Sequence, residues 1–312
     1  MNYSPTPLKR KKFDREGFIY FLFIIPVLIY IIIFKYKPLT GWYYAFTDYK
    51  VGMKSSAIQY LGLKNFTNLV LNEAYLKQVL QVVENTLIMA FMSIFLSSPL
   101  TVLFAICLNE MNSTRARKLV QTLTTLPHFI SVVTLYSVVY FMLSNSGFVN
   151  TLLMDMGKID TPINFLATPD HTYLKMWLYG IWKNIGWNSI VYLAAIAGID
   201  QELYEAAMID GAGRFRRIWH ITVPGIIPTF FVLLVMSIGN LLNTGYEMQY
   251  VFQNSMNQKY IQTIDLYVYN QGISDGNIPF ATAVGMLKSV IALILFSSAN
   301  ALSKAIRGSS VF

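Results

Sequence analysis

Long apolar stretches alternate with short polar connectors along the whole chain. An α-helix rises about 1.5 Å per residue, so stretches of this length reach across a hydrocarbon layer of about 30 Å. The pattern predicts an all-α, polytopic membrane fold over residues 18–303, with tails at residues 1–17 and 304–312. We expect six transmembrane helices: Phe18–Phe34, Asn85–Leu108, Val120–Leu143, Trp177–Ala197, Ile221–Leu242 and Ala281–Leu302.

Composition agrees with a membrane protein. Of the 312 residues, 54% are hydrophobic and 13% are charged, more apolar and much less charged than an average globular domain. The net charge of +8 does not indicate nucleic acid as a partner, because the cations gather beside apolar stretches. The one cysteine, Cys107, lies within an apolar stretch, and we expect it to be a small buried residue.

The first apolar stretch has the basic start of a secretory signal peptide. It is followed by Lys35, Lys37 and Pro38 instead of a small-residue cleavage site. We therefore expect an uncleaved first span.

Positive charge is unevenly divided between the two sets of connectors. The two tails and the connectors 109–119 and 198–220 hold 13 Lys and Arg residues, whereas the other three connectors hold 9 in about twice the length. The positive-inside rule then places both termini and the 198–220 connector on the cytoplasmic side of a plasma membrane.

That connector contains the most distinctive pattern of the chain. Residues 205–224 read EAAMIDGAGRFRRIWHITVP. Helix formers run from Gln201 to Asp210, Gly211 interrupts them, and three arginines follow. The pattern predicts two short helices joined at a glycine, within a loop of residues 201–220.

The spacing of this connector resembles the EAA loop of permease subunits from bacterial ATP-driven (ABC) importers of type I. Val223 stands where that family usually has leucine. The resemblance implies a cytoplasmic loop on which a separate ATPase docks. The residues that carry it are Glu205, Ala206, Ala207, Asp210, Gly211, Ile221 and Pro224.

A wider resemblance covers most of the chain. Residues 182–200, WKNIGWNSIVYLAAIAGID, are similar to the segment before the EAA loop in sugar permeases of the maltose-transporter type. The apolar opening resembles a subgroup assigned to oligosaccharide and polysaccharide fragments. The resemblance implies a second homologous permease, two ATPase subunits, an extracytoplasmic solute-binding protein and an oligosaccharide substrate as partners. It also implies that ATP and magnesium bind to the ATPase, with no cofactor in this chain.

Signatures of catalysis are missing from the sequence. There is no G-x-x-x-x-G-K-[ST] phosphate-binding loop and no H-E-x-x-H spacing, and His128, His171 and His220 are far apart. We expect a transport subunit and not an enzyme.

Polar residues recur at helical spacing inside three of the apolar stretches. A lysine at mid-bilayer costs about 2.5 to 3.5 kcal/mol on insertion scales, so these faces should point to protein or water. They are Lys183, Asn184, Trp187 and Asn188; then Ser237, Asn240, Asn243, Thr244 and Glu247; and finally Thr282, Lys288 and Ser289.

Two interpretations of these faces stay open: bonding between helices, or a polar passage for substrate. For the passage we single out Lys183, Asn184, Trp187, Asn188, Asn240, Asn243 and Glu247. Trp187 and the asparagines suit a neutral sugar, and Lys183 also suits an acidic one. We therefore predict inward movement of an oligosaccharide. An importer of amino acids, peptides or ions is the alternative, and a secondary transporter or channel is a third class.

Overall fold

The computed structural model describes residues 15–243 and 245–307, so most of the two predicted tails and Thr244 lie outside the described residues. Within that part of the chain the structure is helical and has no strand, which confirms the all-α prediction. The α-helices are α1 (Arg15–Ile31), α2 (Lys64–Leu71), α3 (Glu73–Met92), α4 (Ser98–Asn109), α5 (Thr114–Thr125), α6 (Val132–Leu143), α7 (Phe148–Asp155), α8 (Thr172–Ala197), α9 (Gln201–Ile209), α10 (Arg214–Arg217), α11 (Val223–Gly239), α12 (Glu247–Phe252), α13 (Gln258–Ile261), α14 (Ile264–Tyr269) and α15 (Ile278–Arg307). Short 3-10 and π-helical turns, η1 (Ile32–Tyr36), η2 (Lys37–Phe46), η3 (Ser55–Ala57), η4 (Ser93–Ser97), η5 (Leu126–Phe129), η6 (Ile218–Thr222) and η7 (Asn270–Ser274), join several of them.

Among the described residues, five helical stretches are long and apolar enough to cross a membrane, so the chain is a multi-pass membrane protein. Helix α8, which contains the predicted span Trp177–Ala197, is not among the five, although its 26 residues extend about 39 Å. Polar side chains such as Lys183 and Asn184 lower its hydropathy. The six-span count stays a prediction. The five stretches are Gly17–Phe46, Glu73–Asn109, Val132–Asp155, Arg214–Gly239 and Ile278–Ala301.

The predicted span Val120–Leu143 is wrong as a single helix. The chain leaves α5, makes the turn η5 and becomes extended at Ile130, and α6 begins afresh at Val132. Pro127 at the start of η5 lacks a backbone N–H, and the Ser131 hydroxyl accepts a hydrogen bond from the Thr134 N–H, which caps α6. A proline and a capping serine thus divide an apolar stretch that hydropathy alone joins.

The predicted span Ile221–Leu242 also has different limits. Its helix begins already at Arg214, runs through α10 and η6 into α11, and ends at Gly239. The chain then turns, with the Asn243 N–H donating to the Asn240 carbonyl at 2.8 Å. The helical spacing expected from Ser237 to Glu247 therefore stops at Gly239, and Glu247 begins α12.

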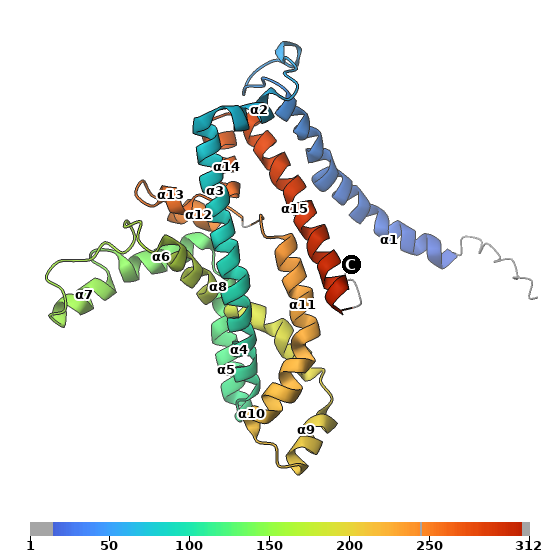
Figure 1. Cartoon of the computed structure of the whole chain (residues 1–312), viewed down its shortest axis with the longest axis vertical. Helices are drawn as coiled ribbons and strands as arrows, with labels where there is room; N and C mark the ends of the chain where they lie inside the picture. Colours follow the sequence, from blue (N-terminus) through green and yellow to red (C-terminus); the bar gives the residue numbers. More distant parts are fainter. Residues whose placement is uncertain (1–14, 244, 308–312) are drawn as a thin grey trace, which may run out of the picture.

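Close glycine contacts set the packing of the long helices. A Cβ atom at Gly186 of α8 would lie 2.3 Å from the Thr124 backbone of α5, and one at Gly239 would lie 2.3 Å from the Phe296 ring of α15. Side chains are excluded at both points, so the helices approach closely. Figure 1 shows α3, α8, α11 and α15 side by side, with α9 at one end of the molecule and α2 at the other.

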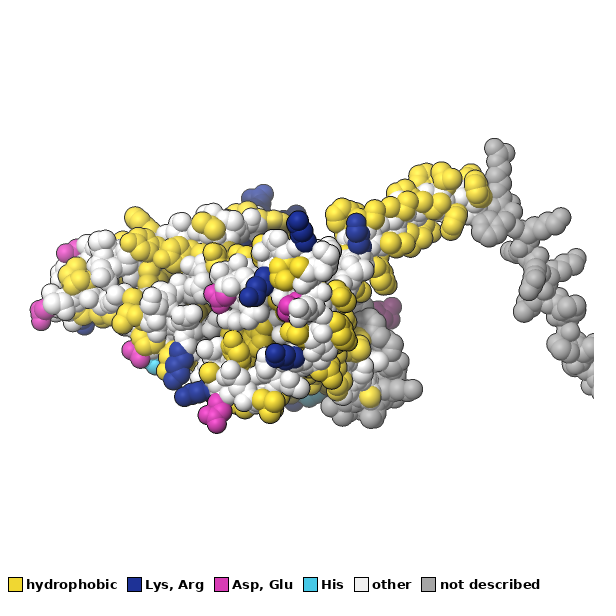
Figure 2. Space-filling view, turned by 90° about the horizontal axis from the view of Figure 1, so that it is seen from above, with side chains coloured by type: hydrophobic (Ala, Val, Ile, Leu, Met, Phe, Trp, Pro, Cys, Tyr) yellow, Lys and Arg dark blue, Asp and Glu magenta, His cyan; other side chains and the backbone are white. Residues whose placement is uncertain are grey.

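Helix α1 lies apart from this bundle. Figure 2 shows it as an apolar arm extending from the body, and none of residues 17–31 is buried within the chain. Cys107 on α4 is exposed, so the expectation of a buried cysteine is wrong. The apolar surface of α1 and the Cys107 side chain are thus both exposed on this chain.

Candidate functional site

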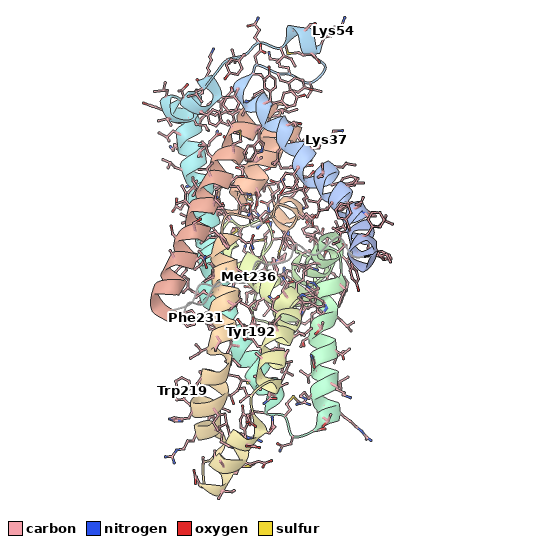
Figure 3. All side chains as sticks on the ribbon, turned by 90° about the vertical axis from the view of Figure 1, so that its right-hand side faces the viewer. Lys37, Lys54, Tyr192, Trp219, Phe231 and Met236 are labelled. Atoms are coloured by element: carbon pink, nitrogen blue, oxygen red, sulfur yellow. The ribbon has the colours of Figure 1, made fainter. Side chains whose placement is uncertain are left out.

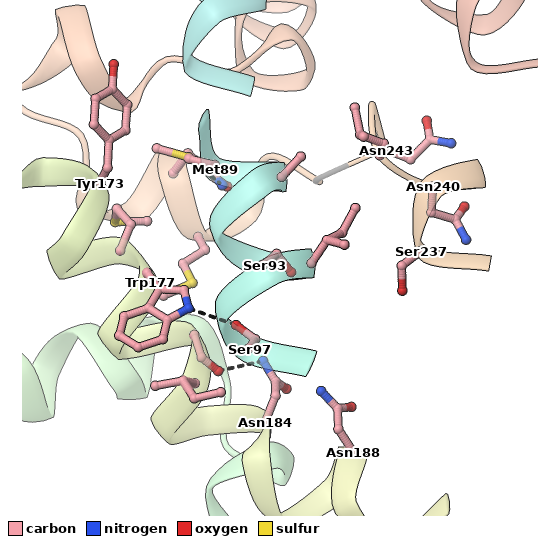
Figure 4. A pocket seen from close by; sticks show the side chains of 18 residues that line it. Met89, Ser93, Ser97, Tyr173, Trp177, Asn184, Asn188, Ser237, Asn240 and Asn243 are labelled. Carbon is pink, nitrogen blue, oxygen red and sulfur yellow. Dashed lines mark hydrogen bonds between the residues drawn. The ribbon is translucent and has the colours of Figure 1, made fainter. Parts of the chain in front are cut away.

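A cavity of about 400 Å³ opens between α3, α8, the end of α11 and α12 (Figure 4). Its walls combine apolar side chains with hydroxyls and amides, and none of its lining residues is charged. The polar ones are Ser93, Ser97, Tyr173, Trp177, Asn184, Asn188, Ser237, Asn240, Asn243 and Gln249. Hydroxyl and amide groups both donate and accept hydrogen bonds, so this lining matches a polyhydroxyl ligand.

Several of these groups are held by neighbours and others project into the cavity. The Trp177 indole donates to the Ser97 hydroxyl at 2.8 Å, which ties α8 to the end of η4. The Asn184 amide donates to the Gly180 carbonyl at 3.0 Å. Figure 4 shows Asn188 pointing away from its own helix, across from Asn240 and Ser237. The cavity therefore joins polar groups from α3 and η4, from α8 and from the end of α11, which are far apart in the sequence.

The second feature is the loop at the α9 end of the molecule. Asp200 caps α9 by accepting from the Glu202 N–H at 3.0 Å. At the other end Gly211 has a φ of +74°, the Gly211 N–H donates to the Met208 carbonyl at 3.1 Å and the Ala212 N–H donates to the Ala207 carbonyl at 2.8 Å. This is a Schellman cap, which favours glycine because its φ is positive. Two short helices joined at a glycine are what the spacing predicts.

Polar contacts fix the loop to the bundle. The Tyr204 and Thr222 hydroxyls lie 2.9 Å apart, which ties α9 to η6. The Arg214 guanidinium pairs with Glu110 at 2.9 Å and donates to the Asn112 side chain at 2.9 Å. The loop is thus attached both to the helix that follows it and to the α4–α5 connector.

The outer surface of the loop is apolar. Ile209 and Phe215 are each 86% exposed and Trp219 is 70% exposed, with Leu203 and Met208 also exposed. Figure 3 shows Trp219 near one end of the molecule and Lys54 at the opposite end. Glu205 and Ala206 are exposed on the same short helix, and Ala207 is half-buried. A surface of this kind is typical of a protein contact.

Residues 85–308, which include the cavity and the loop, match the family described as the binding-protein-dependent transport system inner membrane component. The chain belongs to this family. Its members are permease subunits that carry out transport and not catalysis.

Curated relatives agree with the family. Protein LplB of Bacillus subtilis (strain 168) is 38% identical over 291 residues, which cover 93% of this permease and 89% of the relative. The polygalacturonan/rhamnogalacturonan transport system permease protein YteP of the same organism is 37% identical over 294 residues, covering 94% and 89%.

A solved structure is also similar. A chain in the crystal structure of a bacterial alginate ABC transporter, in complex with an alginate pentasaccharide-bound periplasmic protein, is 34% identical to this permease. The TM-score is 0.84, and the match covers 95% of this permease and 97% of that chain. The comparisons confirm the predicted family and fold, and they favour carbohydrate over amino acids, peptides or ions as the cargo class.

The permease places four of the predicted pathway residues on the cavity wall: Asn184, Asn188, Asn240 and Asn243. Sequence reasoning missed others, including Trp177 and Ser97. Trp177 precedes Asn184 by seven residues, two helical turns, so its position on the same face was detectable.

Lys183, Trp187 and Glu247 lie outside the cavity wall. The Lys183 ammonium donates to the carbonyls of Pro127, His128 and Ile130, at the break between α5 and α6. The Trp187 ring stacks on the His128 ring, with centroids 4.6 Å apart and planes 2° from parallel. Both side chains therefore pack α8 against η5, as the interpretation of bonding between helices expects. Glu247 is exposed at the start of α12.

The polar face of α15 makes internal contacts. Lys288 pairs with Asp265 of α14, and the two side chains are only 13% and 17% exposed. The second Asp265 oxygen accepts from the Gly245 N–H at 2.9 Å. Thr282 and Ser289 donate to carbonyls one turn earlier in their own helix. Lys288 thus faces the protein interior, one of the environments the sequence predicts for it.

A polar groove of about 780 Å³ lies at the end of α3 away from α9, between α3, α13, α14 and η7. Burial, followed by the nearby Tyr75 and Asp275, raises the pKa of Tyr267 to about 12. The Tyr267 hydroxyl donates to the Gln78 side chain at 3.3 Å. This bond holds α14 against the start of α3.

Proposed function

We propose that this permease forms part of the membrane path through which an oligosaccharide is imported. The observation that carries the proposal is the cavity inside the helix bundle of this family member. Its wall presents hydroxyls and amides, and none of its lining residues is charged. One relative is named for the transport of polygalacturonan and rhamnogalacturonan. The similar solved structure contains a periplasmic protein bound to an alginate pentasaccharide. We propose the same chemical class here, with its hydroxyls meeting the asparagines of the cavity.

The energy source in this proposal is a separate ATPase pair that carries ATP and magnesium. The exposed apolar side chains around Gly211, with Glu205, Ala206, Ala207 and Asp210, form its docking surface. Ile221 and Pro224 connect that surface directly to α11, whose end lines the cavity. Movement of the docked ATPases is then transmitted along α11. A second homologous permease closes the open side of the cavity, and a solute-binding protein delivers the substrate.

Uptake by the reconstituted complex tests this function. Vesicles with internal ATP and no ion gradient should accumulate an alginate or galacturonan oligosaccharide supplied on its binding protein. Accumulation that needs an ion gradient and no ATP would instead indicate a secondary transporter. Asn188→Ala should lower uptake about tenfold, the effect of removing one hydrogen bond to a bound ligand.

Trp187→Ala is the matched control for Asn188→Ala. Trp187 directly precedes Asn188 on α8, but its ring packs on His128. It should lower the thermal stability of the complex and leave uptake per assembled complex near normal. Loss of uptake in the Trp187 variant alone would contradict the assignment of the cavity wall.

The membrane orientation has its own test. We predict that both termini and the loop around Gly211 are cytoplasmic, since cations concentrate on that side. In a Cys107→Ala background, Ser146→Cys and Met256→Cys, both at exposed positions, should react with an impermeant thiol reagent on intact cells. Gly213→Cys should react only after the membrane is opened. The reverse pattern would invert the topology.

A further inference from the structure

The polar groove between α3, α13, α14 and η7 has a wall rich in side-chain amides. Its volume of about 780 Å³ is within the usual range for a small-molecule site. An amide both donates and accepts, so it can bond a sugar hydroxyl in either direction. The groove therefore suits a polyhydroxyl ligand, as the cavity does. The amides belong to Gln78, Gln81, Gln258, Gln262, Asn270 and Gln271.

The groove also carries positive charge, which the cavity wall lacks. Lys77 of α3 and Lys259 of α13 line it, both residues are exposed, and neither forms an ion pair with a described residue. The Lys259 ammonium lies over the Tyr260 ring, 5.4 Å from its centroid. Among the lining residues only Asp275 is acidic, and its carboxylate accepts from the Gln271 amide at 2.8 Å. Two lysines against one aspartate leave the groove net positive.

The groove and the cavity lie along the same face of α3. Residues of both walls follow one another at spacings of three and four, the spacing of one helical face. In order, this face carries Lys77, Gln78, Gln81 and Val82 of the groove, then Asn85 and Thr86, then Met89 and Ala90 of the cavity. One helix therefore runs from the groove to the cavity.

Asn85 separates the two spaces and bonds to both walls. Its side-chain oxygen accepts from the Gln81 amide of the groove at 3.2 Å and from the Tyr173 hydroxyl of the cavity at 2.6 Å. Its side-chain nitrogen donates to the carbonyls of Lys259 and Gln262, at 2.9 and 2.8 Å. Asn85 is 0% exposed beneath these partners. The groove and the cavity are thus neighbours on either side of one buried asparagine.

We propose that the polar groove is an outer binding site for an acidic oligosaccharide, with its carboxylates on Lys77 and Lys259 and its hydroxyls on the amides. Each uronate ring carries a carboxylate, and the uncharged cavity wall offers it no cation. The groove supplies cations next to the cavity, at the end of α3 away from α9. In the proposed orientation this end is extracytoplasmic, where substrate arrives. The permease itself then favours acidic over neutral oligosaccharides. This inference rests on the proposed function and adds to it a second site with a charge preference.

Cysteine labelling of the assembled complex, without its binding protein, tests the site. In a Cys107→Ala background, Ser255→Cys places a thiol at an exposed groove position and should react with an impermeant maleimide. The probe is alginate or galacturonan pentasaccharide, whichever the wild type transports, and it should protect the thiol. The same pentasaccharide with its carboxyl groups reduced to alcohols should need about a tenfold higher concentration, because it makes no ion pairs. Ser146→Cys, exposed outside the groove, should react with no protection.

Substitution of the lysines identifies the groups that bind the carboxylates. Lys77→Gln and Lys259→Gln should each raise the half-protecting concentration of the acidic sugar about two- to fivefold, the effect of losing one exposed ion pair. High salt should reduce this effect, because it screens exposed charges. Protection by the carboxyl-reduced sugar should not change. Lys54→Gln is the matched control, since Lys54 is exposed at the end opposite to Trp219 (Figure 3) and does not line the groove.

Three results would overturn the inference. A Ser255→Cys thiol that is unreactive in the complex would show that another membrane subunit covers the groove. Protection by the sugar-free binding protein, with none by the oligosaccharide, would show that the groove is a protein-docking surface. Equal protection by the acidic and the carboxyl-reduced sugar, unchanged in both lysine variants, would show that the lysines bind no carboxylate.

The two proposals fail in different ways. If the wild-type complex imports neither acidic pentasaccharide with ATP, the proposed function falls and the outer site falls with it. If the wild type imports one of them and that sugar does not protect Ser255→Cys, only the outer site is overturned.

Discussion

Gly211→Leu should nearly abolish ATP-driven uptake while leaving the permease inserted in the membrane. Gly211 has a φ of +74°, and a side chain in that left-handed conformation costs about 1 to 2 kcal/mol. That cost corresponds to about a five- to thirtyfold shift against the native cap. Leucine would therefore displace the end of α9, which carries the predicted ATPase contacts of Glu205 to Asp210.

The same loop contains a matched control. Gly213 has an extended backbone with a φ of −67°, and a Cβ atom there would meet nothing within 4 Å. The Gly213→Ala permease should insert into the membrane, assemble and support uptake coupled to ATP hydrolysis as the wild type does. The measurement is ATP hydrolysis stimulated by loaded binding protein, together with uptake, in purified complexes. Normal stimulation in Gly211→Leu would rule out this loop as the docking element.

Lys288→Met should strongly destabilise the permease. It would leave the Asp265 carboxylate, 17% exposed, without its counter-charge, and breaking one side of a buried pair costs about 3 to 5 kcal/mol. The turn at Gly245 depends on the same carboxylate through its N–H bond. We therefore expect a large fall in the thermal midpoint of the assembled complex.

The double variant Lys288→Met with Asp265→Asn distinguishes charge from packing. Asparagine retains an oxygen that can accept from Gly245 and removes the uncompensated charge. The double variant should recover most of the stability lost in Lys288→Met. A double variant as unstable as the single one would show that the ion pair has no part in the effect.

The loop around Gly211 shows how much of the structure can be predicted from residues that are close together in the sequence. Helix formers and a glycine at the break act within a few residues, and the structure has the two short helices that they predict. The cavity was partly predictable for the same reason. Asn184 and Asn188 share a helical face in the sequence and line the cavity together in the structure.

The errors arise where distant contacts decide. Val120–Leu143 is continuous in hydropathy, yet Pro127 and Ser131 divide it and Lys183, more than 50 residues later, bonds to the break. Trp187 lies on the expected helix, but only the position of His128 determines which neighbour its ring meets. Periodicity specifies a face of a helix and not the element that covers it.

The joint between α5 and α6 is synthesised before the residue that binds it. Three of its carbonyls are bound by Lys183, and the His128 carbonyl precedes that lysine by 55 residues. At a synthesis rate of about 5 to 20 residues per second, Lys183 is made roughly 3 to 11 s after the joint. During that interval the joint lacks the ammonium group that its carbonyls bind in the folded protein. The first half of this protein therefore cannot reach its final shape in the membrane until α8 has followed it there.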